Sequence, residues 1–215
     1  MYKRQIQIDL LQIFILLITR SDHNYLVGGC VRDILTGGIP DDYDIVTDIP
    51  MPDLKKVFAE AGGWKVKETG ENFLVLNASR GGRNYEIANF RKEGVYLDGR
   101  RPEKVEIGTI EEDAARRDFT VNAMYLEPFT WEFIDPLGKG KSDVETRTLR
   151  FIGKAKDRIR EDYLRVFRFY RFLRKGYRPD PKSLRACREL FDEAYAKTTP
   201  ERVRVEVEKM AGLVS

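Results

Sequence analysis

Two aspartates and a double glycine form the first group of residues whose types and spacing suit a chemical reaction. Gly28 and Gly29 follow the apolar pair Leu26-Val27, so the backbone there could approach a triphosphate at the start of a helix. Asp42 and Asp44 are two residues apart, which on a strand places both carboxylates on one face. Carboxylates about 4 Å apart repel by about 4 kcal/mol at a surface-like dielectric, a cost that a divalent cation removes. The pattern predicts a magnesium site suited to nucleotidyl transfer.

A third carboxylate would strengthen this interpretation. Glu86 lies on a predicted strand over residues 85–90, and it would join the aspartates if that strand lies beside theirs. The site could then hold two metal ions, or one metal ion and a general base. The alternatives are an ordinary exposed strand glutamate and, for the glycines and aspartates, a simple turn with solvated acids.

A second cluster is the segment RRDFTVNA, residues 116–123. Arg116 and Arg117 are adjacent in this segment and offer paired donors for triphosphate oxygens. Asp118 and Asn122 are four residues apart, and on a helix they could meet a ribose hydroxyl from one face. Helix caps and surface ion pairs are the alternative.

A third cluster suits the reading of a nucleobase. Asp162 and Arg165 are three residues apart, and on one helix face they would offer an acceptor beside a charged donor. Adenine and cytosine present an amino donor next to a ring-nitrogen acceptor, whereas guanine and uracil present the opposite order. The pair would therefore select ATP and CTP. The alternative is an intrahelical salt bridge.

Composition excludes several other classes of protein. The 215 residues are 42% hydrophobic, which is enough for a packed core. Two cysteines and one histidine without paired spacing argue against a disulfide framework or a zinc site and favour a reducing, cytoplasmic location. The apolar run over residues 10–18 contains Gln12, is followed by the polar residues Arg20, Asp22 and His23, and is too short to span a membrane, so neither export nor membrane insertion is expected.

Charge is unevenly distributed along the chain. The net charge is +3, but residues 147–178 hold twelve Lys or Arg and three acids, a local net charge of +9. Such a segment could hold a triphosphate or an RNA backbone, although a solvated helical face is the alternative.

The periodicity of the apolar residues predicts two regions that differ in secondary structure. Helices over residues 6–20 and 52–61 alternate with strands over 25–27, 73–77 and 85–90, the last two joined by a Gly81-Gly82 turn. Helices over residues 155–175, 181–196 and 200–213 follow. We expect an α+β domain over residues 1–140 and a helical domain over residues 141–215.

Taken in order, these clusters resemble the bacterial-type (class II) tRNA nucleotidyltransferase and poly(A) polymerase family of the DNA polymerase beta superfamily. The resemblance rests on these motifs: GGCVRD with DDYD, RRDFTVNA, DPLGKGKSDVETRTLRFIG, EDYLRVFRFYRF and ERVRVEV. It implies a nucleotidyltransferase head with a mixed sheet and helices, followed by an all-helical neck.

The resemblance also implies residue roles. Asp42 and Asp44 would bind the metal and, with Glu86, form the catalytic group, although the following Ala88-Asn89 departs from the family's usual two threonines. Nucleotide binding is implied for ten residues: Gly28, Gly29, Arg32, Asp33, Arg116, Asp118, Asn122, Asp162, Arg165 and Arg168.

The implied activity is template-independent addition of CCA, or of its terminal A, to the tRNA 3′ end from CTP and ATP with Mg²⁺. The stretch from Arg91 to Pro102 resembles the flexible loop of enzymes that add the terminal A, and no counterpart of the arginine-rich segment of bacterial poly(A) polymerases is seen. Poly(A) synthesis, a non-catalytic nucleotide- or RNA-binding module and a small-molecule nucleotidyltransferase remain alternatives. Family members usually continue into body and tail domains, so tRNA binding here is expected to need missing C-terminal domains, a partner chain or the basic neck.

Overall fold

The computed structural model describes residues 8–68, 75–93 and 105–213. The chain divides into two compact units. The first unit comprises Met1–Lys92, Val105–Arg116 and Asn122–Gly138, and the second comprises Glu93–Lys104, Arg117–Val121 and Lys139–Ser215. The assignment of domains to residues 1–140 and 141–215 stays a prediction.

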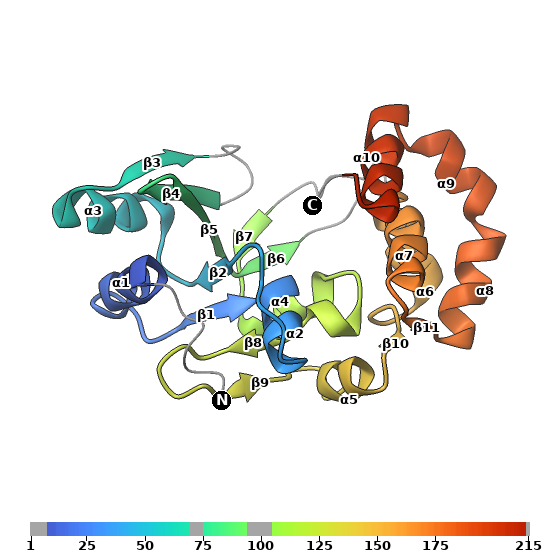
Figure 1. Ribbon diagram of the computed structural model, residues 1–215, viewed down its shortest axis with the longest axis horizontal. Coiled ribbons are helices and arrows are strands. Elements are labelled where there is room, and N and C mark those ends of the chain that lie inside the picture. The colour runs from blue at the N-terminus through green and yellow to red at the C-terminus, as the bar shows by residue number, and fades with distance from the viewer. Residues whose placement is uncertain (1–7, 69–74, 94–104, 214–215) are drawn as a thin grey trace. The chain divides into compact units, whose positions relative to one another are not determined.

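A seven-stranded mixed sheet forms the centre of the first unit (Figure 1). Its order is β3-β4-β5-β2-β1-β8-β9, and β2 and β5 run parallel while the other neighbours run antiparallel. The strands are β1 (Asn24–Val27), β2 (Asp44–Thr47), β3 (Lys65–Glu68), β4 (Val75–Arg80), β5 (Arg83–Asn89), β8 (Tyr125–Leu126) and β9 (Phe133–Ile134). A separate pair joins β6 (Arg91–Glu93) and β7 (Val105–Ile107).

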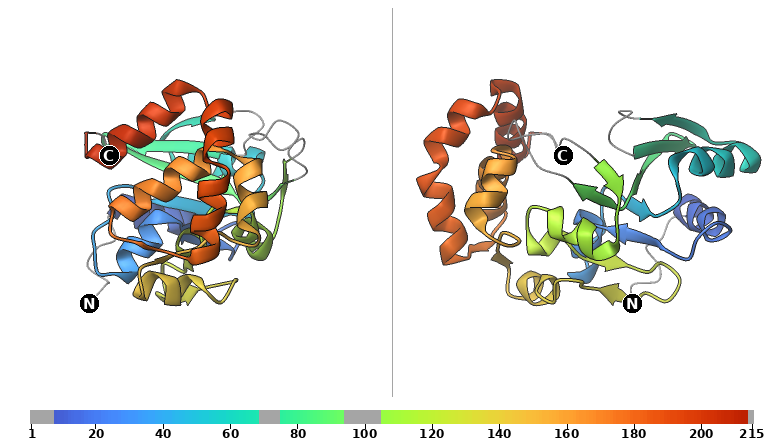
Figure 2. Two further views of the ribbon diagram at one scale, coloured as in Figure 1. Left: turned by 90° about the vertical axis from the view of Figure 1, so that its right-hand side faces the viewer. Right: turned by 180° about the vertical axis from the view of Figure 1, so that it is seen from behind.

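Four α-helices accompany this sheet in the described part of the first unit. They are α1 (Ile8–Ile18), α2 (Gly29–Leu35), α3 (Met51–Ala61) and α4 (Ile110–Arg116). The apolar period of α1 places one face in the core, where Leu10, Ile13 and Phe14 are fully buried. Figure 2 shows α1 and α3 from behind, and these helices pack against each other. The predicted α+β class is confirmed.

Helices account for most of the second unit. They are α5 (Gly140–Glu145), α6 (Ala155–Glu161), α7 (Leu164–Arg174), α8 (Pro181–Glu189), α9 (Phe191–Lys197) and α10 (Pro200–Ala211). The unit also contains two short parallel strands, β10 (Thr148–Leu149) and β11 (Arg178–Pro179). Its core holds Phe119, Phe151 and Phe169, whose rings lie 4.8 to 6.2 Å apart between centroids. No helix in the described ranges is long and apolar enough to cross a membrane.

The helix predicted over residues 155–175 is wrong as one continuous element. Asp162 has extended backbone angles, φ −150° and ψ 106°, and separates α6 from α7. Its carboxylate accepts a hydrogen bond from the Leu164 N–H at 3.1 Å, which satisfies a donor at the start of the new helix. The helix predicted over residues 181–196 is likewise interrupted at Leu190, which is buried between α8 and α9.

A nearly buried ion pair joins α7 to α10. Arg171 Nε lies 2.7 Å from Glu206 Oε2, and the two side chains are 13% and 7% exposed. Removing one partner of such a pair leaves the other charge without compensation, which costs more than the pair itself contributes.

We therefore expect Glu206→Ala to lower the free energy of unfolding by about 3 kcal/mol, because the nearly buried Arg171 would lose the carboxylate that lies 2.7 Å from its Nε. Glu208→Ala is the control, since its pair with Arg204 is 3.5 Å long and more exposed, and a loss below about 1 kcal/mol is expected there. Chemical denaturation followed by circular dichroism measures both. Equal losses in the two variants would contradict the importance of the buried pair.

Candidate active site

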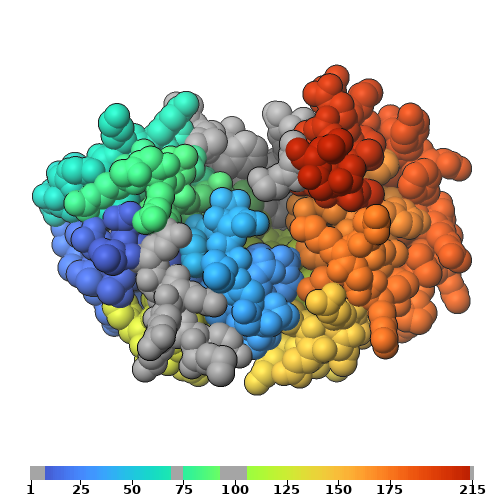
Figure 3. All heavy atoms as spheres, viewed as in Figure 1, coloured from blue at the N-terminus to red at the C-terminus, as the bar shows by residue number. Residues whose placement is uncertain are grey.

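Gly28 turns the chain from β1 into α2. Its φ of 78° and ψ of −130° are accessible to glycine at little cost, and its N–H donates to the Met124 carbonyl at 3.3 Å. Gly29 begins α2 directly afterwards. The structure thus contains the predicted strand, tight turn and helix, and Figure 3 shows the segment from α2 to the start of β2 at the surface. A role of this turn in phosphate binding stays a prediction.

Two carboxylates lie on the solvent-exposed face of two neighbouring strands, and a third lies just before one of these strands. Asp44 is the register partner of Glu86 in the parallel pairing of β2 with β5, so both side chains leave the same face of the sheet. Asp42, Asp44 and Glu86 are exposed, while Tyr43 and Ile45 between them are buried. The condition for Glu86 to join the aspartates, that its strand lies beside theirs, is met.

One detail of the prediction is wrong, because β2 begins at Asp44 and Asp42 lies in the preceding bend. The partner strand β1 ends opposite Asp44, at Val27, since the chain turns at Gly28. Asp42 therefore has no β1 residue to pair with. The alternation of exposed and buried residues nevertheless continues back to Asp42.

The carboxylate group fits a hard divalent cation in an open site. Within the described residues, neither Asp42 nor Glu86 has an ion-pair partner, and no three metal-ligating side chains gather closely enough to enclose an ion. Mg²⁺ is commonly held by one or two carboxylates together with substrate phosphates and water. The donor set therefore suits a metal ion whose coordination is completed by a triphosphate.

Arg32 is held in place beside the turn by two other predicted site residues. Its Nη1 donates to Asn122 Oδ1 at 2.7 Å, and its Nη2 lies 2.8 Å from Asp33 Oδ1. The Arg32 side chain is only 14% exposed. A fixed guanidinium at this position is suited to phosphate oxygens because its orientation is already determined.

Arg116 ends α4 and is tied to a buried acid that the sequence analysis did not single out. Its Nη2 donates to Asp113 Oδ1 at 2.6 Å, and Tyr125 Oη donates to Asp113 Oδ2 at the same distance. Asp113 is fully buried. Arg116 thus neutralises a buried carboxylate, and any contact with triphosphate would be additional to this role.

Asp118 is paired with Arg168 within the second unit. Arg168 Nε and Nη2 donate to Asp118 Oδ2 at 2.8 and 2.6 Å. Asp118 raises the pKa of Arg168 through Coulombic attraction, so the guanidinium stays charged. Both residues were predicted to bind nucleotide, and the structure brings them together across 50 residues of sequence.

The helix predicted to carry both Asp118 and Asn122 is wrong. The segment forms only a 3₁₀ turn over Thr120–Asn122, and Asp118 belongs to the second unit while Asn122 belongs to the first. Phe119 forms an isolated bridge with Phe151, and Thr120 Oγ1 donates to buried Asp143 at 2.7 Å. These bonds attach residues 117–121 to the second unit and prevent a continuous helix. The shared helix face for a ribose hydroxyl is therefore absent.

Asp162 and Arg165 also differ from the predicted arrangement on one helix. Asp162 lies between α6 and α7, and Arg202 Nη2 from α10 lies 3.2 Å from each of its carboxylate oxygens. Arg165 is in the first turn of α7 and donates through Nη1 to Glu161 Oε2 at 2.8 Å. Asp162 and Arg165 are thus each oriented by another residue and not by each other.

Sequence reasoning missed Arg202 as a site residue although it quoted the motif ERVRVEV that contains it. The partner of Arg202 lies 40 residues earlier, so no local pattern reveals the contact. Glu161 was also overlooked, although its position four residues before Arg165 on a helical pattern was a usable signal.

Asn89 stands where the family resemblance led us to expect a threonine. Its Nδ2 donates to the carbonyls of Thr47 and Ile49 at 3.1 and 2.6 Å, and the residue is fully buried. Asn89 therefore fastens the end of β5 to the end of β2. Although Asn89 replaces the usual threonine, its side chain still holds these two strands together.

Cys30 is buried with its Sγ 3.9 Å from the Asp44 carbonyl, but it is not a candidate nucleophile. Its Sγ donates to the Val27 carbonyl at 3.2 Å, and burial raises the pKa of its thiol to about 12. Only the thiolate is strongly nucleophilic, and it is scarce near neutral pH in this environment.

Both thiols are buried, so we expect little reaction of the native chain with a thiol-specific disulfide reagent at pH 8 and reaction of two thiols after unfolding. Single Cys30→Ser and Cys187→Ser variants assign any signal that appears. Native labelling of Cys30 at the rate of a free thiol would contradict the assigned environment.

Comparison with known proteins identifies the family of the chain. The model of the Poly A polymerase head domain matches residues 24–150. The CCA-adding enzyme of Lactobacillus delbrueckii subsp. bulgaricus is 38% identical over 189 residues, which cover 87% of this chain and 46% of that protein. The human mitochondrial CCA tRNA nucleotidyltransferase 1 is 35% identical over 199 residues, covering 90% and 45%.

The solved structure of Bacillus stearothermophilus CCA-adding enzyme in complex with CTP superimposes with a TM-score of 0.79. It is 30% identical, and the match covers 94% of this chain and 47% of that one. The chain spans about half the length of the curated relatives it matches. These matches confirm the resemblance inferred from the motifs, and the chain belongs to the tRNA nucleotidyltransferase and poly(A) polymerase family.

Proposed function

We propose that the chain carries the catalytic centre of a template-independent RNA nucleotidyltransferase. It adds CCA, or the terminal A of CCA, to the 3′ end of tRNA from CTP and ATP and releases pyrophosphate. The observation that carries the proposal is the register of Asp44 opposite Glu86, with Asp42 exposed two residues earlier. The printed names of its relatives, and the CTP complex of one of them, support this choice of substrates.

Asp42 and Asp44 are the residues that would hold the metal, with Glu86 completing the catalytic group. When bound, Mg²⁺ supplies positive charge against the triphosphate and the departing pyrophosphate. The hydroxyl oxygen at the RNA 3′ end loses its proton and forms a bond to the α-phosphorus, while the bond from the α-phosphorus to the oxygen that bridges to the β-phosphate breaks and pyrophosphate leaves. Exposed carboxylates on one sheet face suit this role because they are accessible to both reactants.

The remaining first-unit residues bind the triphosphate rather than react. Gly28 and Gly29 leave the backbone open to phosphate at the start of α2. Arg32 supplies fixed positive charge, and its orientation depends on Asp33 and Asn122. The chain thus contributes positioning and neutralisation, which are the main requirements of this type of transfer.

Choice of base falls to the second unit. The Asp162 carboxylate accepts from the amino group of adenine or cytosine, while Arg165 donates to the neighbouring ring nitrogen. Arg202 orients Asp162, and Glu161 orients Arg165, so both readers are held by other side chains. Asp118 and Arg168 form a further charged pair available to the nucleotide.

The two buried, free cysteines are compatible with a cytoplasmic setting.

Incorporation of labelled nucleoside triphosphates tests the proposal. Each of the four is supplied with Mg²⁺ to tRNA transcripts that end before CCA, after the first C and after CC. CTP followed by ATP, with termination at CCA, supports the full reaction, whereas ATP on the CC end alone identifies an A-adding enzyme. Long A tails would identify poly(A) synthesis instead, and no incorporation would contradict catalysis by this chain.

Asp42→Asn and Asp44→Asn each remove a charge that we assign to metal binding. We expect kcat/KM for incorporation to fall about a thousandfold in either variant, the loss of several kcal/mol of transition-state stabilisation. Asp41→Asn is the matched control, because Asp41 is adjacent and exposed but carries no assigned role. Similar losses in all three variants would contradict the assignment.

Asp162→Asn replaces an obligatory acceptor with a side chain that can both donate and accept. We expect the preference for ATP and CTP over GTP and UTP to fall by about tenfold or more, because one correct hydrogen-bond pairing contributes roughly 1–3 kcal/mol. Competition assays with mixed nucleotides measure the ratio, and Asp192→Asn on exposed α9 is the control. An unchanged ratio with a lower overall rate would show that Asp162 has a structural role only.

A further inference from the structure

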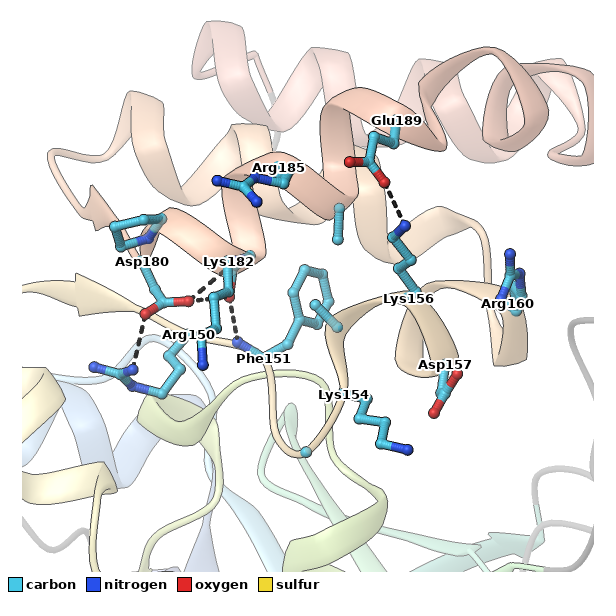
Figure 4. Close-up of a pocket in the computed structure, with 15 residues that line it drawn as sticks. Arg150, Phe151, Lys154, Lys156, Asp157, Arg160, Asp180, Lys182, Arg185 and Glu189 are labelled. Carbon is cyan, nitrogen blue, oxygen red and sulfur yellow. Dashed lines mark hydrogen bonds and ion pairs between the residues drawn. The ribbon is translucent and has the colours of Figure 1, made fainter.

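A groove of about 990 Å³ lies within the second unit, between the start of α6 and α8. It is lined by none of the residues assigned to metal, triphosphate or base. Figure 4 shows side chains from the segment before α6, from α6 itself and from α8 around it. The groove is therefore a separate feature from the proposed nucleotide site.

Its charges are strongly unbalanced once internal pairs are considered. Asp180 is matched by Arg150 at 2.8 Å, and Glu189 is matched by Lys156 at 2.5 Å. Among the described residues, the other lining cations make no ion pair: Lys154, Arg160, Lys182 and Arg185. Asp157 is the one lining carboxylate without an ion pair in the described part of the chain. The groove thus carries an excess of about three positive charges.

The cations come from two separate parts of the lining. Lys182 and Arg185 are three residues apart and share a face of α8, whereas Lys154 precedes α6 and Arg160 lies in its last turn. Figure 4 shows these two sets on different elements. Between them the floor of the groove is formed by apolar residues that are buried or half-buried, namely Phe151, Ala155 and Ala186. Because the cations are spread over two elements, an extended polyanion with repeated phosphates fits this arrangement better than a single small anion.

We propose that this groove binds the sugar-phosphate backbone of the RNA substrate. The identification of that RNA as tRNA rests on the proposed function. Lys154, Arg160, Lys182 and Arg185 contact phosphates, and the contacts depend on charge and not on sequence. The groove adds RNA affinity without contributing to the choice of nucleotide.

The test is direct binding of a fluorescently labelled tRNA transcript to the 215-residue chain, measured by anisotropy without nucleotide over a series of salt concentrations. The groove variant is Lys182→Gln with Arg185→Gln. The matched control is Arg174→Gln with Arg188→Gln, which removes the same charge from exposed second-unit positions that do not line the groove. Poly-glutamate and inorganic phosphate serve as competitors.

We expect the groove variant to bind tRNA roughly tenfold more weakly at low salt. The slope of a plot of the logarithm of the binding constant against the logarithm of the salt concentration should become shallower by about one to two. The control should change much less, and neither competitor should displace RNA at equal charge concentration. The proposal would be overturned by equal losses of affinity in the two variants or by no loss in either. It would also be overturned if the unaltered chain did not bind tRNA, or if poly-glutamate displaced the labelled tRNA as effectively as unlabelled RNA does.

Transfer to a short primer ending in CC separates this inference from the proposed function. The primer is too short to need an extended backbone contact, so the groove variant should extend it at the unaltered rate. Absence of extension by the unaltered chain would refute catalysis, while the anisotropy data would still decide whether the groove binds RNA. A matching loss of short-primer extension and tRNA binding would assign Lys182 and Arg185 to the reaction itself and overturn the separate role.

Discussion

The placement of like-charged carboxylates on one exposed sheet face is the constraint on which the chemistry proposed for the first unit depends. The parallel register of β2 and β5 sets Asp44 beside Glu86 at the spacing of neighbouring strands, about 5 Å. Side chains of like charge directly opposite each other on neighbouring strands repel. The fold maintains this arrangement through buried residues such as Tyr43 and Ile45 and through Asn89, which bonds the ends of the two strands. A cation bound at this face would relieve the repulsion, which is why we propose it as the place where metal and triphosphate bind.

In the second unit, by contrast, most of the charged side chains under discussion lie beside a side chain of opposite charge. The side chains that we propose to bind the nucleotide are matched in pairs, with Asp118 bound to Arg168, Asp162 to Arg202 and Arg165 to Glu161. Pairing limits the orientations of these long side chains, so less conformational entropy is lost when a ligand binds. The groove between α6 and α8 departs from this rule because several of its cations have no ion-pair partner among the described residues. This contrast is why a polyanion is the ligand that the groove suits.

Local sequence patterns predicted several elements of the first unit, among them the strand that carries Glu86. The apolar segment before Gly28, the proline at the start of α3 and the alternation in β5 each follow from local rules, and these elements form close to the expected residues. The four exposed residues of β3 show no apolar alternation, and two-residue strands such as β8 are too short for any period. The loop expected over residues 91–102 lies outside the described residues from position 94 onward.

The errors at the candidate site have a common physical origin in contacts between distant parts of the sequence. Residues 117–121 resemble a helix locally, but bonds to Arg150 and Asp143 hold them in an irregular segment. Asp162 interrupts a long amphipathic pattern because its side chain caps α7 and meets Arg202. A single sequence shows which residue types are present, whereas these partners become visible only in three dimensions.

Calorimetric titration of the chain with each of ATP, CTP, GTP and UTP, with and without Mg²⁺ and without RNA, tests most directly whether this chain itself selects a metal-bound nucleotide. The account predicts binding of ATP and CTP that depends on Mg²⁺ and much weaker binding of GTP and UTP. Equal affinity for all four nucleotides, or binding of ATP and CTP that is unaffected by removal of the metal, would contradict it.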